Sequence, residues 1–163
     1  MLNKWIIAAC SVAAFTMMSF SNSVTTSSKG IASYEDFQAA TKITWTDLGK
    51  IDFIKKKDRV YGEVMFPVIN PSLKKLQGKK IIAKGFIVPI DNKNYALSKN
   101  VFAQCFFCGN AGPETIMGIH FKGSTPKLKT DTYVTIEGTF RYNDDNVDDW
   151  IYHIENAVIT EKK

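Results

Sequence analysis

The segment Tyr133-Val-Thr-Ile-Glu-Gly-Thr-Phe-Arg-Tyr142 decides the fold class of this chain. Val134, Ile136 and Phe140 fall on one face of an extended strand and mostly polar residues fall on the other, because successive side chains of a strand alternate between its faces. Gly138 lies in the middle of the segment, where a glycine favours a bulge or a sharp bend. The pattern therefore predicts a long, bent strand with one buried face.

A second segment of this kind precedes it, from Lys80 to Ile90, and also carries a central glycine, Gly85. Gly85 again permits strong bending. The alternation of apolar and other residues predicts a strand with four large apolar side chains on a common face. These four are Ile82, Phe86, Val88 and Ile90.

Three further segments complete the set of strands. They are Tyr95–Val101, Thr115–Phe121 and Trp150–Ile159, the last with a register break between Ile154 and Ala157. Five bent strands within about 80 residues suit a small closed barrel, because central glycines let a short sheet curl onto itself. We expect a mainly β fold: a five-stranded closed barrel like that of oligonucleotide/oligosaccharide-binding (OB) proteins, with a short helical or extended N-terminal extension.

The extension is expected to combine short elements. Thr44–Phe53 is predicted to be extended or partly helical, Lys55–Lys57 to form a turn, and Val60–Val68 to be extended. Asn70-Pro71-Ser72 then opens a short helix, because proline is suited to the first helical position. Gly78 is expected to end that helix.

The first residues resemble a secretory leader. A basic start is followed by the apolar stretch Trp5–Phe20, and Ser19-Phe20-Ser21 offers the small-x-small pattern of a cleavage site. We expect a signal peptide at 1–21, a polar linker with a short helix at 22–43, and one barrel domain at 44–163. The mature chain then has no membrane span, because the apolar stretch is too short to cross a bilayer comfortably.

Export to the periplasm or envelope follows from this leader. Cys10 ends a box with the residue types of a lipoprotein cleavage site, but few apolar residues precede it and the apolar run continues beyond it. We therefore do not expect lipidation at Cys10. The formal net charge of +5 is spread over scattered lysines, and Arg59 and Arg141 are the only arginines. A nucleic-acid partner is not indicated, because two arginines are too few to form a surface that reads bases through bidentate contacts.

Two cysteines remain once the leader is removed, in the motif Cys105-Phe-Phe-Cys108-Gly. In an oxidising compartment they can form a disulfide, although so small a ring adds only about 2 kcal/mol of stability. Alternatively, they supply two of the four ligands of a tetrahedral metal site. In a third interpretation Cys105 attacks a partner disulfide and Cys108 resolves it, but a turn follows the motif instead of the helix that lowers a thiol pKa in such enzymes.

His120 and His153 are the only histidines of the chain. The third and fifth strands of an OB barrel pair in parallel, so we expect both imidazoles side by side on the outer face of the barrel. Two histidines and two cysteines make a Cys2His2 ligand set, for which zinc is the typical ion. The metal ligands expected from the sequence are therefore Cys105, Cys108, His120 and His153.

Three neighbours of the cysteines are candidate accessory residues. Glu114 follows Pro113 and offers an acid or a further ligand. Phe106 and Phe107 are adjacent, so in an extended segment they point to opposite sides. One of them is expected in the core, and the other as part of an apolar docking surface for a partner.

Between Thr44 and Ile159 the chain resembles the exported bacterial proteins grouped as domain of unknown function 3299. The specific part is Cys105-Phe-Phe-Cys108-Gly followed by Gly112-Pro-Glu114, and the rest is more generic. The other matching stretches are Trp45-x-x-Leu48, Pro67, Leu73-x-x-Leu76-x-Gly78-Lys79, Gly85-Phe-Ile-Val-Pro89, Val134-x-Ile136-x-Gly138 and Asn156-Ala157. The resemblance implies a bacterial envelope protein, with a context of export or metal handling and no established enzymatic activity.

Together these features predict a non-enzymatic envelope protein, accessory to a transport or metal-handling system. Its Cys-x-x-Cys site binds a transition metal, with zinc favoured, or is locked as a disulfide while a partner protein or transporter docks. The alternatives are a thiol–disulfide exchange factor that uses Cys105 and Cys108, and a structural accessory subunit without chemistry.

Overall fold

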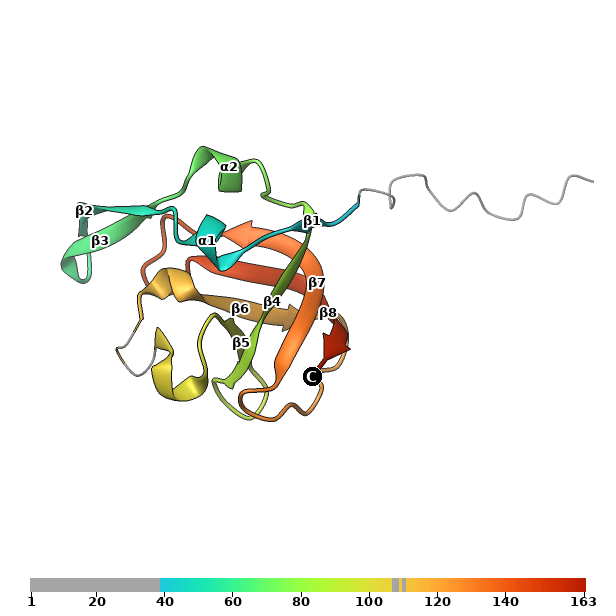
Figure 1. Cartoon of the computed structure of the whole chain (residues 1–163). Helices are drawn as coiled ribbons and strands as arrows, with labels where there is room; N and C mark the ends of the chain where they lie inside the picture. The colour runs from blue at the N-terminus through green and yellow to red at the C-terminus, as the bar shows by residue number, and fades with distance from the viewer. Residues whose placement is uncertain (1–38, 107–108, 110) are drawn as a thin grey trace, which may run out of the picture. The chain divides into compact units, whose positions relative to one another are not determined.

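The computed structural model describes residues 39–106, 109 and 111–163 (Figure 1). These residues belong to a compact unit, Glu35–Lys163. The expected signal peptide, most of the expected linker, Phe107 and Cys108 lie outside the described residues. Within the described part of the chain, no helix is long and apolar enough to cross a membrane.

The described chain consists mainly of strands, with short helical turns between them. In chain order they are β1 (Thr41–Lys42), α1 (Trp45–Leu48), β2 (Asp52–Asp58), β3 (Gly62–Val68), α2 (Pro71–Lys74), β4 (Lys80–Pro89), β5 (Tyr95–Ser98), η2 (Phe102–Gln104), η4 (Pro113–Thr115), β6 (Ile116–Phe121), β7 (Tyr133–Tyr142) and β8 (Tyr152–Lys162).

The expected five-stranded barrel is confirmed. The strand order is β4-β5-β6-β8-β7, and β7 pairs with β4 to close the sheet. All neighbours are antiparallel except β6 and β8, which pair in parallel as expected for the third and fifth strands of an OB barrel. The short β1 adds to β4 in parallel. Figure 1 shows the barrel strands curving around a common interior.

Inward-facing side chains from all five strands fill the barrel. Phe140 and Tyr152 are the largest fully buried ones, and their rings lie 5.9 Å apart. On β4, however, Ile81 and Ile87 face this main core, whereas the sequence grouped Ile82 with Phe86. Both faces of β4 carry large apolar residues, so alternation alone does not identify the inner face.

The two short helices begin at conventional caps. Thr44 and Asp47 form a capping box at the start of α1, and Asn70 caps α2 with Pro71 at its first position, as expected. Hydrogen bonds fix α1 to the barrel: the indole Nε1 of Trp45 donates to Lys84 O at 2.8 Å, and the hydroxyl of Tyr152 donates to Leu48 O at 2.9 Å.

Strands β2 and β3 form a separate hairpin that pairs only with itself among the described residues (Figure 1). The sequence placed a turn at Lys55–Lys57, which is wrong: these lysines lie within β2. The turn comes later because Asp58 Oδ1 accepts hydrogen bonds from the backbone N–H groups of Val60 and Tyr61, at 2.7 and 2.9 Å. A short polar side chain of this kind fixes a turn more strongly than a run of lysines does.

The register break expected in the last strand is confirmed. Asn156 adopts a positive φ of 51°, and the pairing of β6 with β8 shifts between Ile119 and Phe121. The extra residue turns Ala157 back into the core, so both halves of β8 contribute to the barrel interior. Before the break, the odd-numbered residues of β8, His153 and Glu155, face the outside of the barrel, where the candidate site lies.

Candidate metal centre

The parallel pair β6–β8 brings the two histidines together on the outer face of the barrel. Nε2 of His120 lies 3.2 Å from Nδ1 of His153, and the two rings are stacked with centroids 5.4 Å apart. His153 is 3% exposed, whereas the side chain of His120 is 53% exposed. The imidazole of His153 is thus buried, and that of His120 is accessible to solvent.

Glu155 adds a carboxylate to this pair. It lies two residues after His153 on the same strand and therefore on the same face. Its Oε1 is 3.8 Å from Nε2 of His120. One ligand atom from each of His120, His153 and Glu155 lies within 4.8 Å of the others, which makes a group with the donors and spacing to hold a metal ion.

The orientation of His153 is set by one backbone carbonyl and one carboxylate. Its Nε2 lies 2.9 Å from the carbonyl oxygen of Trp150 and 3.2 Å from Oδ1 of Asp149. Both oxygens accept hydrogen bonds, so the neutral ring carries its proton on Nε2 and presents the lone pair of Nδ1 to His120. Metal-binding histidines are commonly oriented by such a hydrogen bond from the other nitrogen.

Gly118 makes room for this arrangement. It is the residue of β6 directly opposite His153 in the parallel register. A Cβ at this position would lie 2.8 Å from Nδ1 of His153 and 3.3 Å from the indole of Trp150. Only a residue without a side chain lets the imidazole approach β6 this closely.

An arginine links the carboxylates around the histidines. The Nε of Arg141 donates to Oε1 of Glu155 at 2.9 Å, and its terminal nitrogens donate to Oδ2 of Asp149 at 3.3 Å. Arg141 pairs with His153 across the β7–β8 ladder, so one strand register positions all these groups. The result is a closed ring of contacts: Arg141, Glu155, His120, His153 and Asp149.

Burial and charge together shift the pKa values of two members of this ring, His153 and Asp149. Burial, and then the Arg141 guanidinium, lower the pKa of His153 below its ordinary value, so the neutral ring is favoured. Burial alone would raise the pKa of Asp149, but the Trp150 N–H, His153 and Arg141 together lower it. A neutral imidazole beside ionised carboxylates is the protonation state in which these groups bind cations.

The distances also suit a single ion. Zinc binds imidazole nitrogen at about 2.0–2.1 Å, so two ligand atoms of a tetrahedron lie about 3.3 Å apart. The two imidazole nitrogens, at 3.2 Å, already have nearly this separation. The carboxylate of Glu155 has to approach His120 slightly to complete a three-ligand set.

Among solved structures, the chain matches the crystal structure of a DUF3299 family protein from Pseudomonas aeruginosa. The chain is thus similar to a member of the family that its motifs resemble. The alignment covers 77% of this chain and 99% of that one, with 12% identity and a TM-score of 0.48. No family model and no curated protein matches the sequence.

The cysteine part of the expected ligand set is placed differently from the histidines. Cys105 is fully buried in a second apolar cluster with Val88, Ala96 and Ile116, against which Trp150 packs. It is not a member of the histidine group. Cys108 lies outside the described residues, so both the four-ligand set and the disulfide stay predictions. Burial among apolar side chains disfavours Cys105 as an attacking thiol, because reactive cysteines are usually partly exposed.

The accessory residues are also apart from the histidine group. Glu114 lies in η4, half-buried, and contributes with burial to a raised pKa of Tyr152. Phe106 is 38% exposed and lines a groove beside the hairpin. Phe107 lies outside the described residues, so the opposite orientation of the two aromatics stays a prediction.

Three members of the ring were missed by the sequence analysis: Glu155, Arg141 and Asp149. Glu155 could have been found, because His153-Ile-Glu155 puts a histidine and a carboxylate on one face of a strand. Asp149 lies in the segment before the last strand, and Arg141 lies among the polar residues of 133–142, and neither position by itself indicates a site. Their roles depend on the register of β7 against β8, which no local pattern reveals.

Proposed function

We propose that this protein is an exported, non-enzymatic envelope protein that binds a transition metal ion through His120, His153 and Glu155. The observation that carries the proposal is the convergence of two imidazole nitrogens and a carboxylate oxygen within 4.8 Å. The hydrogen bond from His153 Nε2 to the Trp150 carbonyl supports it, because it aims the lone pair of Nδ1 at the same point.

Zinc is the best match among common metals. Imidazole and carboxylate ligands suit zinc, and sets of two histidines and one glutamate are known for it. Three protein ligands leave a fourth position for water or for a donor from elsewhere, whereas structural zinc sites are closed by four. A site that is open at one position, with His120 accessible to solvent, suits an ion that is received and passed on. We therefore propose an accessory role in a metal-handling system.

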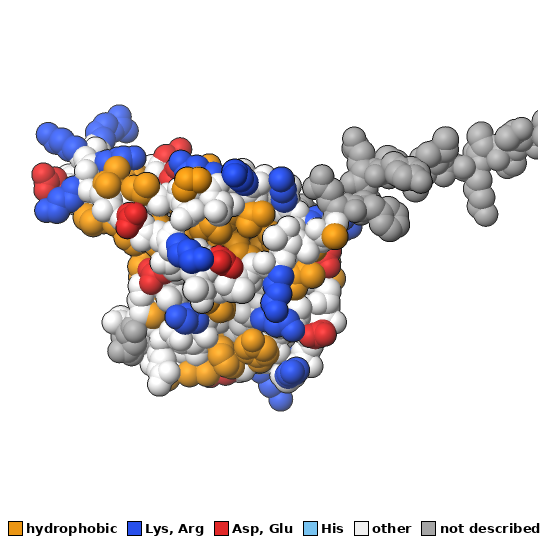
Figure 2. All heavy atoms as spheres, turned by 45° about the horizontal axis from the view of Figure 1, so that its top comes forward, with side chains coloured by type: hydrophobic (Ala, Val, Ile, Leu, Met, Phe, Trp, Pro, Cys, Tyr) orange, Lys and Arg blue, Asp and Glu red, His pale blue; other side chains and the backbone are white. Residues whose placement is uncertain are grey.

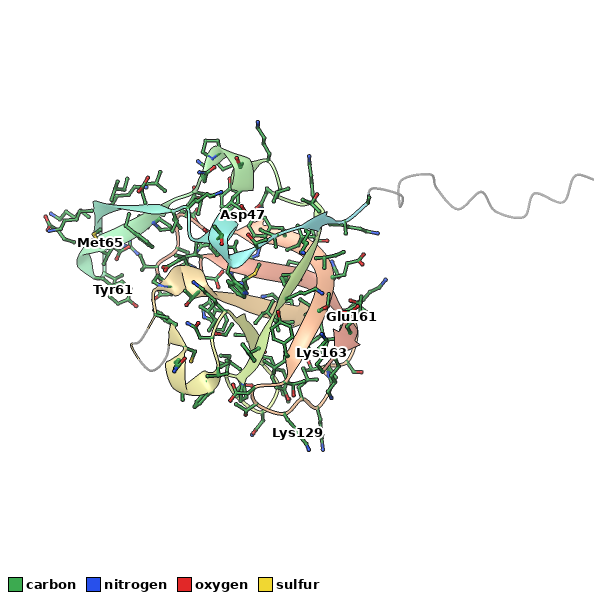
Figure 3. The ribbon with its side chains drawn as sticks, in the orientation of Figure 1. Asp47, Tyr61, Met65, Lys129, Glu161 and Lys163 are labelled. Carbon is green, nitrogen blue, oxygen red and sulfur yellow. The ribbon has the colours of Figure 1, made fainter. Side chains whose placement is uncertain are left out.

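Calorimetric titration with zinc tests this proposal. Protein purified without chelator is expected to bind one ion per chain near neutral pH. His120→Ala removes a ligand and is expected to lower the affinity at least about 100-fold, and Glu155→Gln about 10-fold. The matched control is Glu161→Gln, because Glu161, labelled in Figure 3, lies on the same strand. Its carboxylate contacts Thr135 and Lys84 and not the histidines.

Unchanged zinc affinity in His120→Ala would overturn the proposal. A parallel titration of Cys105→Ser and Cys108→Ser decides whether thiols complete the ligand set. Loss of affinity in these variants, with reduced thiols in the native protein, supports the Cys2His2 site expected from the sequence. Retained affinity supports the three-ligand site.

A further inference from the structure

A groove of about 350 Å³ runs between the β2–β3 hairpin and the loop that joins β7 to β8. On the hairpin side it is lined by Phe53 of β2 and by Met65, Phe66 and Pro67 of β3. Phe53, Met65 and Pro67 lie on one face of the hairpin and Phe66 lies on the other, so the groove borders both faces of β3. On the other side it is lined by residues 146–151, which precede β8.

The edge of β3 is open. Among the described residues β3 pairs with β2 alone, so its second edge has no neighbouring strand. Proline is tolerated at such an edge because its missing N–H is not needed for pairing there, and Pro67 lies in β3. An open strand edge is a template for an added strand, and Pro67 limits such pairing to the residues of β3 that precede it.

Apolar side chains are exposed along this hairpin. Met65 is 53% exposed beside the groove, and Ile54 is 45% exposed on the neighbouring strand. Figure 2 shows hydrophobic side chains on the hairpin, with lysine and arginine side chains gathered at its outer end. Met65 and Tyr61 are labelled on the hairpin in Figure 3. Such a surface is unusual on a free protein and is typical of an interaction site.

The opposite wall of the groove carries carboxylates and is held by hydrogen bonds. Buried Asn143 holds the loop, donating from Nδ2 to the carbonyl oxygens of Asn146 and Asp149 at 2.7 and 3.1 Å. Arg141 balances the charge of Asp149. Asp148 accepts a hydrogen bond from the neutral hydroxyl of Tyr61 at 2.7 Å, which leaves its negative charge in place. The groove thus joins an apolar strand edge to a carboxylate.

We infer that this groove binds an extended segment of a partner protein that adds to the open edge of β3 and presents alternating apolar and cationic side chains. The apolar side chains contact Met65, Val147 and Trp150, and a lysine or arginine of the segment pairs with Asp148. A strand added at an edge gains affinity from backbone hydrogen bonds and specificity from its alternate side chains. The inference does not depend on the metal, although Trp150 and Asp149 form part of both sites.

A pair of labelled peptides tests the inference by fluorescence anisotropy. One peptide alternates leucine and lysine over six residues, and the other alternates leucine and glutamate. Nonspecific attraction favours the glutamate peptide, because the protein has a formal net charge of +5. The groove instead predicts that the lysine peptide binds at least about 10-fold more tightly.

Two variants locate the binding. Met65→Lys places a cation at the open edge, and Asp148→Asn removes the pairing charge, so each is expected to weaken binding of the lysine peptide about 10-fold. The matched control is Val158→Lys, which introduces the same charge at a residue that is 47% exposed on β8 and does not line the groove. It is expected to leave binding unchanged. Circular dichroism checks that each variant is folded.

Equal binding of the two peptides, or unchanged binding in folded Met65→Lys, would overturn the inference. Two other occupants have their own readouts. Binding to vesicles that contain phosphatidylglycerol, without binding of the lysine peptide, would assign the surface to a membrane. A concentration-dependent dimer that Met65→Lys abolishes would assign it to a second copy of the chain. Either result would also overturn the inference of a partner segment.

Discussion

At the scale of single residues, His153 is the side chain on which the candidate metal centre depends. Its ring is almost completely buried, and its two nitrogens face different partners. Nε2 meets the Trp150 carbonyl at 2.9 Å, and Nδ1 meets His120 at 3.2 Å. The buried ring therefore acts as the fixed half of the pair, and exposed His120 as the half that can move.

The space left by Gly118 can be tested directly. In Gly118→Ala the new Cβ would lie 2.8 Å from Nδ1 of His153, closer than real Cβ contacts, so the imidazole has to move away from His120. We expect zinc affinity to fall at least about 10-fold and the free energy of unfolding to fall by about 1–3 kcal/mol. Calorimetry and urea unfolding measure the two effects. Unchanged zinc affinity would show that Nδ1 is not a ligand.

The pKa of His153 predicts how stability depends on pH. Burial and then Arg141 lower this pKa in the folded state, so below its ordinary value of 6.5 the unfolded chain binds more protons than the folded one. The free energy of unfolding should therefore decrease as pH falls from about 7.5 to about 5.5, and be independent of this group above that range. Urea unfolding with a chelator present measures the trend.

His153→Gln is the control for this pH dependence, because it removes the titrating group. The decrease between about pH 7.5 and about pH 5.5 should be smaller in the variant. Asp149, with its lowered pKa, loses its contribution only as pH falls below its ordinary value of 3.8, so the two effects are separable. An equal decrease in wild type and variant would assign the pH dependence to other groups.

At the scale of elements, the register break of β8 is a feature of the fold that the local sequence predicts. The spacing of Tyr152, Ile154, Ala157 and Ile159 predicts the break in register, and Asn156 supplies the residue with positive φ. Asparagine tolerates this conformation better than most residues other than glycine. Gly138 of β7 lies opposite the break, and a side chain there would meet Ile154 and Ala157. The break in register therefore depends on Asn156 of β8, which tolerates the positive φ, and on Gly138 of β7, which leaves space opposite it.

Substitutions at Asn156 test the backbone conformation of the break. Asn156→Gly keeps the positive φ accessible and should change stability by less than about 0.5 kcal/mol, whereas Asn156→Val should cost about 1–3 kcal/mol. Lys162→Val is the control, because a branched residue is favoured at an exposed strand position with ordinary φ. Urea unfolding measures all three variants. Equal stability of the glycine and valine variants would contradict the strained break.

At the scale of the whole molecule, the barrel could be predicted from the sequence, but only part of the candidate metal centre could. Alternation and central glycines predict all five barrel strands, and the barrel type predicts that His120 and His153 are neighbours. The inner face of β4 could not be predicted, because Ile81 and Ile82 are equally apolar. Glu155 and Arg141 meet the histidines only through pairings between strands, which are settled by the whole sheet.

Replacement of the hairpin tests whether the barrel and the groove are separable. Ile54 and Phe66 are paired across β2 and β3, so Asn-Gly can replace 55–65 as a two-residue turn. We expect the barrel to remain folded with its zinc affinity unchanged, because the removed residues form strand pairs only within the hairpin, and the hydrogen bond from Tyr61 to Asp148 lies outside the histidine group. Binding of the leucine–lysine peptide should be lost. Circular dichroism and the two titrations measure this, and an unfolded product would contradict the independence of the barrel.

The parallel pairing of β6 with β8 also has a kinetic consequence. His120 and His153 are separated by 33 residues, and the antiparallel hairpin partner of β8 is β7, so the two imidazoles meet only when the non-local pair has formed. Contacts of this kind form late, because a long loop has to close first. An ion that bridges the two strands would then bind only to chains that have completed folding. It would lengthen the lifetime of the native state while leaving the rate of its formation almost unaltered.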